Sequence, residues 1–524
     1  MNKINRIIFC VIDDVRSKHF FDYIDKGLLP NFKKLMENGI YSKNCITDFP
    51  SITYPTQISI TTGTYTGDYR KELCHGIPLA NWMGRDTKPP FLRDYTAKDM
   101  QIYKLNEDVG NNCQTILEMV GDENTASISQ FLNKGAKYIF PERKTKLAMY
   151  YLLLMYLRNT KRIMIRANSI IIQKLLETFK SPKKFFDIKE PPIASLICFI
   201  SSDLLMHLYG FDSKIYKLNL LHIDKVLGYL VKNLDEMGYL NDTVIVITSD
   251  HGNYKADKVG DLTDFLIANK LTHYHPHKNR KGNMDLAEYG GVGFFNFKGK
   301  INSNSNKFWL QPTIKELENY GKKGINLFKE LFNIKGTQLM YYRDDKNTNN
   351  NGKIYIKRKY IDTNKIITGI IEYKGTGHDY KTKYIIENDE TDVFNYLTDP
   401  KASKLIDGKF HSIDEWLAAT SHLDFPLYPD LIPRHFKNPR SCDIILSNEG
   451  TVVYNIEHGK KKKRTRYFHD IGLKESSVVP LIIGGSLEIP HKEIPFCKIV
   501  DIVPTLLKSL GKIPHRSVIG ESLI

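Results

Sequence analysis

The chain has 524 residues, of which 41% are hydrophobic and 26% charged. This composition is typical of an ordinary globular protein, and the length allows a large core plus at least one inserted subdomain. The net charge of +16 favours anionic substrates or partners. The basic residues are spread along the whole chain, however, and no RNA- or DNA-binding motif accompanies them, so we do not expect nucleic-acid binding.

The seven cysteines are scattered, odd in number and never form a CxxC pair. This spacing argues against a disulfide framework and favours a reducing compartment. The N-terminal run RIIFCVIDD is too short for a signal peptide and leads straight into acidic residues. The apolar stretch 148–157 has about half the length that a bilayer-spanning helix needs. We therefore expect a cytoplasmic protein with no membrane partner.

Several short runs rich in Val and Ile show little alternation, as strands buried on both faces of a parallel sheet do. They are residues 7–12, 196–200, 244–248, 443–446 and 478–483. Helical patterns such as 29–38 and 220–237 lie between them, so the sequence predicts an α/β layered fold. We expect core segments at 1–95, 191–253 and 436–524, a helical insertion at 96–190 and a cap subdomain at 254–435.

Ligands of such a sheet gather at the carboxyl ends of its strands. Asp13 follows the first run, and Asp250 and His251 follow the third, directly before a glycine. Asp203 follows the second run, and His207, four residues later, would lie on the same helical face. Alone, Asp13 also fits a turn or a helix cap, and Asp203 with His207 also fits an N-cap and a surface histidine. Few structural explanations, in contrast, require Asp-His-Gly after such a run. Together they offer carboxylate and imidazole ligands for metal ions.

Two further histidines are candidates for the same chemistry. His469 lies in a loop shortly before the apolar run 478–483. His378, in the sequence GTGHDY, is a rival, but no buried strand pattern follows it. We favour His469 for this reason, and a solvated loop histidine is its alternative.

Thr53 precedes Pro55 and a predicted helix at 56–62. Backbone N–H groups at a helix N-terminus can hold a phosphoryl oxygen. A threonine hydroxyl is a weak nucleophile that coordination to a divalent metal would activate. A helix-capping or turn threonine is the alternative.

The ordered set Asp, Thr, Asp-xxx-His, Asp-His-Gly, His resembles the alkaline phosphatase superfamily and, within it, the nucleotide pyrophosphatase/phosphodiesterase group. The resemblance covers residues 4–82, 193–253 and 440–524, and it implies an alkaline-phosphatase-like fold with a mostly parallel central sheet. It also implies two divalent metal ions, zinc in the family, although manganese or iron would suit the donors too. The implied ligands of one metal are Asp203, His207 and His469, and those of the other are Asp13, Asp250, His251 and the nucleophile Thr53.

The surroundings of Thr53 separate the branches of the superfamily. The segment SITYPTQ lacks the CxPxR-like motif of sulfatases, whereas Thr-aromatic-Pro resembles the phosphodiesterases. The resemblance places Asn81 where that group binds a phosphoryl oxygen, and a neutral amide suits a singly charged diester. Tyr54 would stack on a base or other leaving group. The chain departs from the family pattern Thr-Phe-Pro-Asn-His by ending in Gln57, and it has Cys198 where the group carries a tyrosine.

The sequence thus predicts a hydrolase that cleaves phosphodiester or pyrophosphate bonds in a small anionic substrate, such as a nucleotide, through a phosphorylated Thr53. A phosphomonoesterase, phosphonate hydrolase or mutase of the same superfamily is the nearest alternative. A non-catalytic polyanion-binding protein is the alternative from another class. Nothing in the sequence indicates an oligomeric state.

Overall fold

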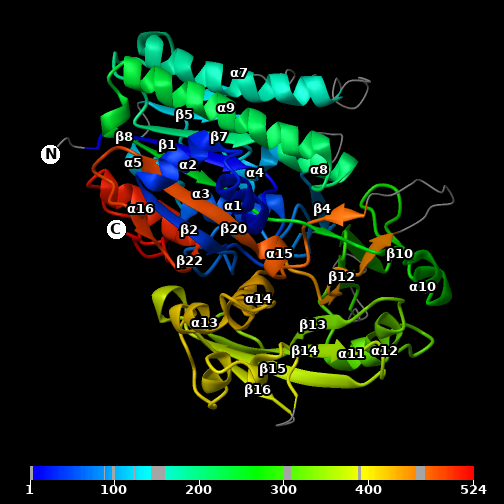
Figure 1. Cartoon of the computed structure of the whole chain (residues 1–524). Helices are drawn as coiled ribbons and strands as arrows, with labels where there is room; N and C mark the ends of the chain where they lie inside the picture. The colour runs from blue at the N-terminus through cyan, green and yellow to red at the C-terminus, as the bar shows by residue number, and fades with distance from the viewer. Residues whose placement is uncertain are drawn as a thin grey trace. The chain divides into compact units, whose positions relative to one another are not determined.

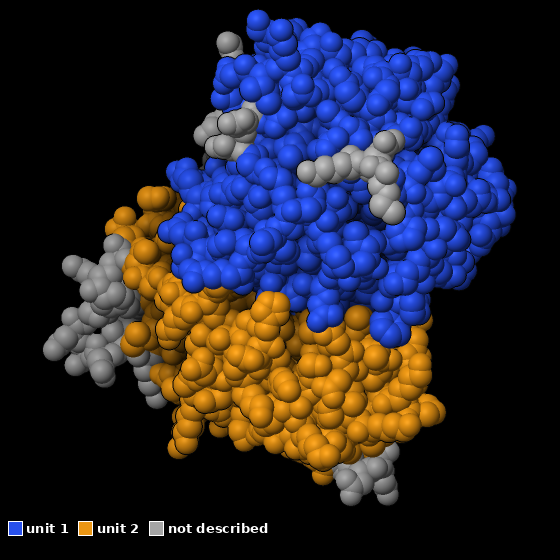
Figure 2. Space-filling view, turned by 90° about the vertical axis from the view of Figure 1, so that its left-hand side faces the viewer, with its two compact units in different colours: residues 1–65, 98–253, 475–524 blue, residues 66–97, 254–474 orange. Residues whose placement is uncertain are grey.

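The computed structural model describes residues 4–87, 89–96, 101–121, 124–142, 160–299, 309–387, 391–455 and 466–524. The chain forms two compact units, which Figure 2 shows in two colours. Unit 1 consists of residues 1–65, 98–253 and 475–524, and unit 2 of residues 66–97 and 254–474. The apolar stretch 148–157 lies outside the described residues. Within the described part of the chain, no helix combines the length and the apolar character that a membrane crossing requires.

Unit 1 is built on a sheet that has nine strands in the described part of the chain, in the order β21-β2-β20-β8-β1-β7-β5-β6, with β22 paired to β2. Its strands are β1 (Arg6–Ile12), β2 (Ile40–Ile46), β5 (Thr125–Ile128), β6 (Tyr138–Phe140), β7 (Ala194–Phe199), β8 (Thr243–Thr248), β20 (Val478–Gly485), β21 (Lys492–Glu493) and β22 (Cys497–Lys498). The central strands β8, β1 and β7 run parallel, and all their residues are buried. Burial on both faces requires apolar side chains at successive positions, which the predicted runs supply.

The predicted mostly parallel α/β fold is therefore confirmed. Strands β8, β1, β7, β5 and β6 are parallel neighbours. The predicted run 478–483 forms β20, which is antiparallel to both β8 and β2.

Two groups of helices pack in unit 1 (Figure 1). In the first group, α1 and α2 contact β20, α2 contacts α9, and α9 contacts α7 and α8. In the second group, α16 contacts α3 and α5, and α5 contacts β7. The bounds are α1 (Ser17–Asp25), α2 (Pro30–Glu37), α3 (Thr53–Thr62), α4 (Leu105–Asp108), α5 (Ile116–Val120), α7 (Thr160–Lys180), α8 (Ser201–Tyr209), α9 (Lys214–Glu236) and α16 (Ile502–Ser509). Helices α2 and α9 confirm the helical patterns predicted at 29–38 and 220–237.

Unit 2 contains an antiparallel sheet that has seven strands among the described residues, in the order β11-β12-β17-β13-β14-β15-β16. These are β11 (Met284–Tyr289), β12 (Val292–Phe297), β13 (Leu339–Arg343), β14 (Asn351–Lys359), β15 (Ile366–Lys374), β16 (Lys381–Ile386) and β17 (Ile444–Ser447). Shorter strand pairs are formed by β3 (Asn81–Gly84) with β4 (Phe91–Asp94), β9 (Tyr254–Lys255) with β19 (Tyr467–Phe468), and β10 (Lys258–Asp261) with β18 (Val452–Asn455). Its helices are α10 (Thr263–Ala268), α11 (Ile314–Glu318), α12 (Leu327–Phe332), α13 (Ile413–Thr420) and α14 (Tyr428–Lys437), while α15 (Lys474–Ser477) joins the two units along the chain.

The two units divide the chain differently from the boundaries expected from the sequence. Residues 96–190 are not only a helical insertion, because β5 and β6 extend the main sheet beside β7. The run 443–446, expected in the core, forms β17 between β12 and β13 of unit 2. Unit 2 also takes in residues 66–97 and continues to residue 474, beyond the expected cap at 254–435. An apolar run identifies a strand, but it does not identify the sheet that the strand joins.

Candidate active site

Three neighbouring parallel strands of unit 1 end at one edge of the sheet, and each is followed by a predicted ligand. Asp13 directly follows β1, Asp250 comes two residues after β8, and Asp203 comes four residues after β7. The strand order β8-β1-β7 places these three carboxyl ends side by side. The topology therefore gathers acids that lie up to 237 positions apart in the sequence.

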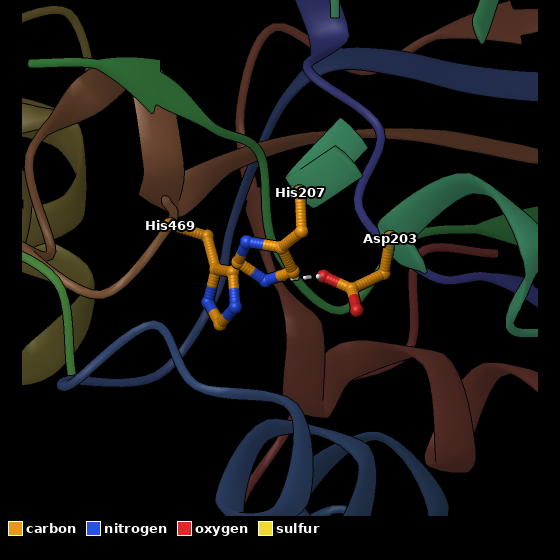
Figure 3. Close-up of side chains that lie close together, drawn as sticks. All are labelled: Asp203, His207 and His469. Atoms are coloured by element: carbon orange, nitrogen blue, oxygen red, sulfur yellow. Dashed lines mark ion pairs between the residues drawn. The ribbon is translucent and has the colours of Figure 1, made fainter. Parts of the chain in front are cut away.

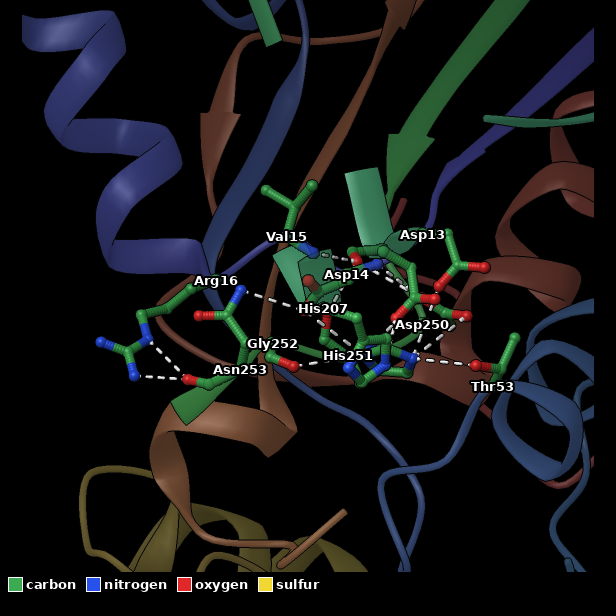
Figure 4. A network of polar contacts seen from close by, with 12 residues as sticks. Asp13, Asp14, Val15, Arg16, Thr53, His207, Asp250, His251, Gly252 and Asn253 are labelled. Atoms are coloured by element: carbon green, nitrogen blue, oxygen red, sulfur yellow. Dashed lines mark hydrogen bonds and ion pairs between the residues drawn. The ribbon is translucent and has the colours of Figure 1, made fainter. Parts of the chain in front are cut away.

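His251 lies at the centre of this group, fully buried. Its Nε2 atom is 3.1 Å from Oγ1 of Thr53, 3.5 Å from Oδ1 of Asp13 and 3.7 Å from Oδ2 of Asp250 (Figure 4). Ligand atoms of Asp13, Asp203 and His251 all lie within 4.8 Å of one another. One ring nitrogen thus faces the hydroxyl and the carboxylates together.

The buried carboxylate of Asp13 tests whether these residues suit a cation. Among the described residues, none donates a hydrogen bond to Oδ1 of Asp13. Burial raises the pKa of Asp13 well above its usual range, and the charges of Asp250 and Asp203 raise it further. A divalent cation would supply the missing positive charge and accept the free lone pairs, so the donor set fits a metal ion.

The same charges act on the imidazole of His251. Burial lowers its pKa, but the carboxylates of Asp250 and Asp14 outweigh burial and raise the pKa to about 9. A proton on His251 therefore balances part of the negative charge, and a cation would take over that role.

Asp203 and His207 form a second pair on α8. Nε2 of His207 lies 3.2 Å from Oδ1 of Asp203, and both side chains are about a quarter exposed (Figure 3). Their spacing of four residues places both on one helical face, as the sequence predicted. These two side chains could share one cation.

Thr53 is the first residue of α3, a ten-residue helix whose other residues, apart from Tyr54, are all buried. The burial of the helix fixes the position of its N-terminus. Predicted from the sequence to begin at residue 56, the helix instead includes Thr53 in its first turn. Pro55 in that turn has no N–H, and the N–H of Thr56 donates to the carbonyl oxygen of Ile52 at 3.2 Å. The N–H groups of Thr53 and Tyr54 are therefore the ones placed to meet a phosphoryl oxygen beside the Thr53 hydroxyl.

Gln57 contacts the acidic group, and sequence reasoning did not assign it a role. Its Nε2 atom donates to Oδ2 of Asp250 at 2.8 Å and lies 3.6 Å from Sγ of Cys198. Gln57 is four residues after Thr53, so both side chains project from one face of α3. The spacing of four residues is the only sign of a role for Gln57 in the sequence. The role itself could be inferred only once the fold had placed Asp250 beside it.

The ring of Tyr54 lies 5.3 Å from the ring of Phe131, with the two planes tilted by 40°. Phe131 follows β5 at the same edge of the sheet that carries Asp13 and Asp203. Two aromatic rings from unit 1 thus lie beside the start of α3. Phe131 was not identified from the sequence, because no motif surrounds it.

The remaining predicted site residues belong to unit 2. Asn81 begins β3, and its Oδ1 accepts a hydrogen bond from the hydroxyl of Tyr289. His469 is 8% exposed and directly follows β19, whereas His378 is exposed on a turn between β15 and β16. The roles of Asn81 and His469 at the site stay predictions.

The sequence pattern of the type I phosphodiesterase / nucleotide pyrophosphatase family matches residues 8–324, which is more than half of the chain. The chain belongs to this family. The matched region contains most of β1, all of α3 and α8, and the strand end with Asp250 and His251.

Curated relatives within the family match this chain over shorter stretches. Human ectonucleotide pyrophosphatase/phosphodiesterase family member 5 is 26% identical over 234 residues, covering 44% of this chain and 42% of the relative. An uncharacterised pyrophosphatase/phosphodiesterase of Schizosaccharomyces pombe is 24% identical over 236 residues, covering 44% of this chain and 42% of the relative. The bis(5'-adenosyl)-triphosphatase of Pongo abelii is 24% identical over 244 residues, 44% of each chain. The match thus spans less than half the length of each relative.

Solved structures extend the likeness in fold across the chain. Human ectonucleotide pyrophosphatase/phosphodiesterase 5 superposes with a TM-score of 0.54 at 15% identity, covering 97% of this chain and 96% of that one. The murine protein gives a TM-score of 0.53 at 14% identity, with the same coverage. An inactive threonine-to-alanine variant of the murine protein, solved in complex with AMP, also matches with a TM-score of 0.53. These likenesses establish the alkaline-phosphatase-like fold.

Proposed function

We propose that this protein hydrolyses phosphodiester or pyrophosphate bonds, with the hydroxyl of Thr53 as the nucleophile. The observation that carries the proposal is the position of Thr53 at the start of α3, 3.1 Å from Nε2 of His251. Membership of the type I phosphodiesterase / nucleotide pyrophosphatase family supports the reaction class.

The residues of the site have separate tasks in this reaction. The Thr53 oxygen attacks phosphorus, the alcohol or phosphate leaves, and water later hydrolyses the phosphothreonine. The N–H groups at the start of α3 stabilise the charge that develops on the phosphoryl oxygens. The amide of Asn81 would add a neutral donor, which suits the single charge of a diester.

Two divalent cations are the proposed cofactors. Asp203, His207 and His469 would hold one, and Asp13, Asp250 and His251 the other, together with Thr53. Such cations lower the pKa of a coordinated hydroxyl and stabilise negative charge on oxygen. We propose zinc because imidazole nitrogen and carboxylate oxygen are common zinc ligands. Manganese and iron accept the same donors.

The choice of His469 for the first cation rests on chain connectivity. β19 ends directly before His469 and pairs with β9, which begins three residues after His251. His378, in contrast, lies on an exposed turn between two strands of the antiparallel sheet of unit 2. If His469→Ala and His378→Ala are compared, we expect Zn²⁺ stoichiometry to fall in the first variant alone; a fall in His378→Ala alone would reverse the assignment.

A nucleotide is the substrate that we propose. One structural relative was solved with AMP, and one curated relative is named as a bis(5'-adenosyl)-triphosphatase. The adjacent rings of Tyr54 and Phe131 offer flat apolar faces on which a base can stack.

The first experiment compares hydrolysis of bis-p-nitrophenyl phosphate and p-nitrophenyl phosphate by the Zn²⁺-loaded protein. We expect a preference for the diester, loss of turnover of at least about a thousandfold in Thr53→Ala, and partial retention in Thr53→Ser, which keeps a hydroxyl nucleophile. Thr363→Ala, in an exposed turn of unit 2, is the matched control and should keep full activity.

Each other outcome of this comparison has a definite meaning. A monoester preference that is lost in Thr53→Ala would move the protein to the phosphomonoesterase branch. Bound metal without turnover of either ester or of any dinucleoside polyphosphate would favour the polyanion-binding alternative.

The cytoplasmic location is likewise a proposal, which fractionation of expressing cells would test.

A further inference from the structure

Asp14 has an unusual backbone conformation for an aspartate. Its φ is +64°, in the left-handed region that glycine adopts without steric cost and in which other residues are strained. The residue is fully buried next to Asp13. Such a conformation persists only where surrounding contacts hold it, and it often marks a functional position.

Backbone contacts fix Asp14 on both sides. Its N–H donates to Oδ1 of Asp250 at 3.2 Å, and its carbonyl oxygen accepts a hydrogen bond from the hydroxyl of Tyr216 at 2.7 Å. The side chain is held as well, because Nδ2 of Asn253 donates to Oδ1 of Asp14 at 2.9 Å (Figure 4). The carboxylate therefore has little freedom to turn away.

This fixed carboxylate faces the rear of the His251 ring. Oδ1 of Asp14 lies 3.6 Å from Nδ1 of His251, and the carbonyl oxygen of Gly252 lies 3.1 Å from the same nitrogen. The other nitrogen, Nε2, faces Thr53 and Asp13. The Gly252 carbonyl oxygen lies at hydrogen-bond distance from Nδ1, and the negative charge of Asp14 beside it adds to the preference for a proton on that nitrogen. This arrangement leaves the lone pair on Nε2 for a cation.

We propose that Asp14 is a positioning residue that keeps the proton of His251 on Nδ1 and directs Nε2 toward the Thr53 hydroxyl. The inference rests on the proposed function, because it assumes that His251 binds a divalent cation there. Carboxylates behind metal-binding imidazoles raise the basicity of the ligand and fix its orientation. This role explains why a buried acid occupies a position whose backbone would suit glycine better.

The left-handed backbone allows a variant that separates positioning from folding. Asp14→Gly removes the carboxylate but relieves the backbone strain, so the metal-free variant should unfold at the same or a higher temperature than the parent protein. Asp14→Asn keeps an oxygen near Nδ1 but removes its negative charge, and asparagine tolerates the same φ. Asn364→Gly is the control for backbone relief, because Asn364 has a φ of +53° in an exposed turn.

The test titrates each full-length protein with Zn²⁺ in competition with a chromophoric chelator. In the parent we expect two Zn²⁺ per chain. In Asp14→Gly one of the two should bind roughly 10- to 100-fold more weakly, with a smaller loss in Asp14→Asn and none in Asn364→Gly. On diester substrate, kcat should fall more than KM rises in Asp14→Gly, because the nucleophile is misplaced while substrate contacts persist.

The outcomes separate this inference from the proposed function. A parent protein that binds no Zn²⁺ would overturn the proposed function. A parent that binds two Zn²⁺, with equal affinity in Asp14→Gly, would overturn the positioning role alone. If Asp14→Gly fails to fold, Asp14→Asn decides, and parent-like affinity together with parent-like kcat in that variant would count against the inference.

Discussion

At the scale of single residues, neutral donors hold the buried carboxylate of Asp250 in place. Asp250 accepts hydrogen bonds from the side chain of Gln57 and from the backbone N–H groups of Asp14 and His251. Three donors from different segments thus hold this one side chain, and the orientation of the carboxylate is fixed.

Gln57→Leu should weaken this arrangement, because it removes the side-chain donor to Asp250 at nearly constant volume. We expect kcat/KM on a diester to fall by roughly 10- to 100-fold, as for other residues that orient a metal ligand. We also expect the free energy of unfolding to fall by about 1–3 kcal/mol. Steady-state kinetics and urea unfolding measure the two effects. Gln173→Leu, at an exposed position of α7, should change neither; parent-like kinetics in Gln57→Leu would show that Asp250 is positioned without it.

The sequence identified Asp13, Asp203, Asp250 and His251 because each follows an apolar run, and strand ends carry ligands in this fold class. Gln57 and Asp14 could not be assigned in the same way. Gln57 meets Asp250 across 193 positions of sequence, and the strained φ of Asp14 has no signature in its neighbours. Roles that depend on a tertiary contact are visible only after the fold is known.

At the scale of elements, Gly252 joins the end of β8 to a second segment of unit 1. Its N–H donates to the carbonyl oxygen of Ser476 at 2.7 Å. The N–H of Asn253 donates to the carbonyl oxygen of Glu475 at 3.1 Å. A Cβ atom on Gly252 would lie 2.2 Å from the carbonyl oxygen of Glu475. The Asp-His-Gly motif thus contains glycine because two backbone segments approach closely there.

Gly252→Ala should therefore push the segment with His251 away from Glu475. We expect a loss of about 1–3 kcal/mol in unfolding free energy, as for other overpacked sites, and a weaker Zn²⁺ affinity at one of two sites. Thermal unfolding and chelator competition measure these effects. Gly238→Ala is the comparison, because a Cβ there meets nothing within 4 Å but the φ of +76° strains an alanine; it should lose stability without losing Zn²⁺ affinity. Retained Zn²⁺ affinity in Gly252→Ala would mean that the loop absorbs the added methyl group.

Strand existence was predictable at this scale, whereas strand direction and partners were not. The runs that form β1, β7 and β8 are apolar because both faces of those strands are buried. The run that forms β17 is equally apolar, yet it belongs to the antiparallel sheet of unit 2. Burial selects apolar residues in both sheets, so composition alone cannot distinguish them.

At the scale of the whole molecule, the buried site links folding stability to pH. In the metal-free protein, the folded-state pKa of His251 is about 9, above the ordinary value of about 6.5. That of Asp14 is about 6, above the ordinary value of about 3.9. Both groups bind protons more tightly in the folded state, so their contributions to stability are present at low pH and lost as pH rises.

The pH windows follow from these values. The contribution of Asp14 is lost as pH rises from about 4 through 6, and that of His251 as pH rises from about 6.5 through 9. The loss of unfolding free energy that comes from His251 is on the order of 3 kcal/mol. We therefore expect the Tm of the chelator-treated protein to fall between pH 6.5 and 9, and His251→Gln to remove most of that slope.

Zn²⁺ should flatten the same pH profile, because a bound cation compensates the deprotonated carboxylates and needs the neutral form of His251. The Zn²⁺-loaded protein should accordingly gain stability over the metal-free protein as pH rises from 6.5 to 9, and the difference in Tm should be smaller in His251→Gln. Calorimetric scans with Zn²⁺ and with chelator at matched pH values measure this difference. A difference in Tm that shrinks as pH rises would mean that the cation and the proton do not compete for His251, and it would place the cation elsewhere in the protein.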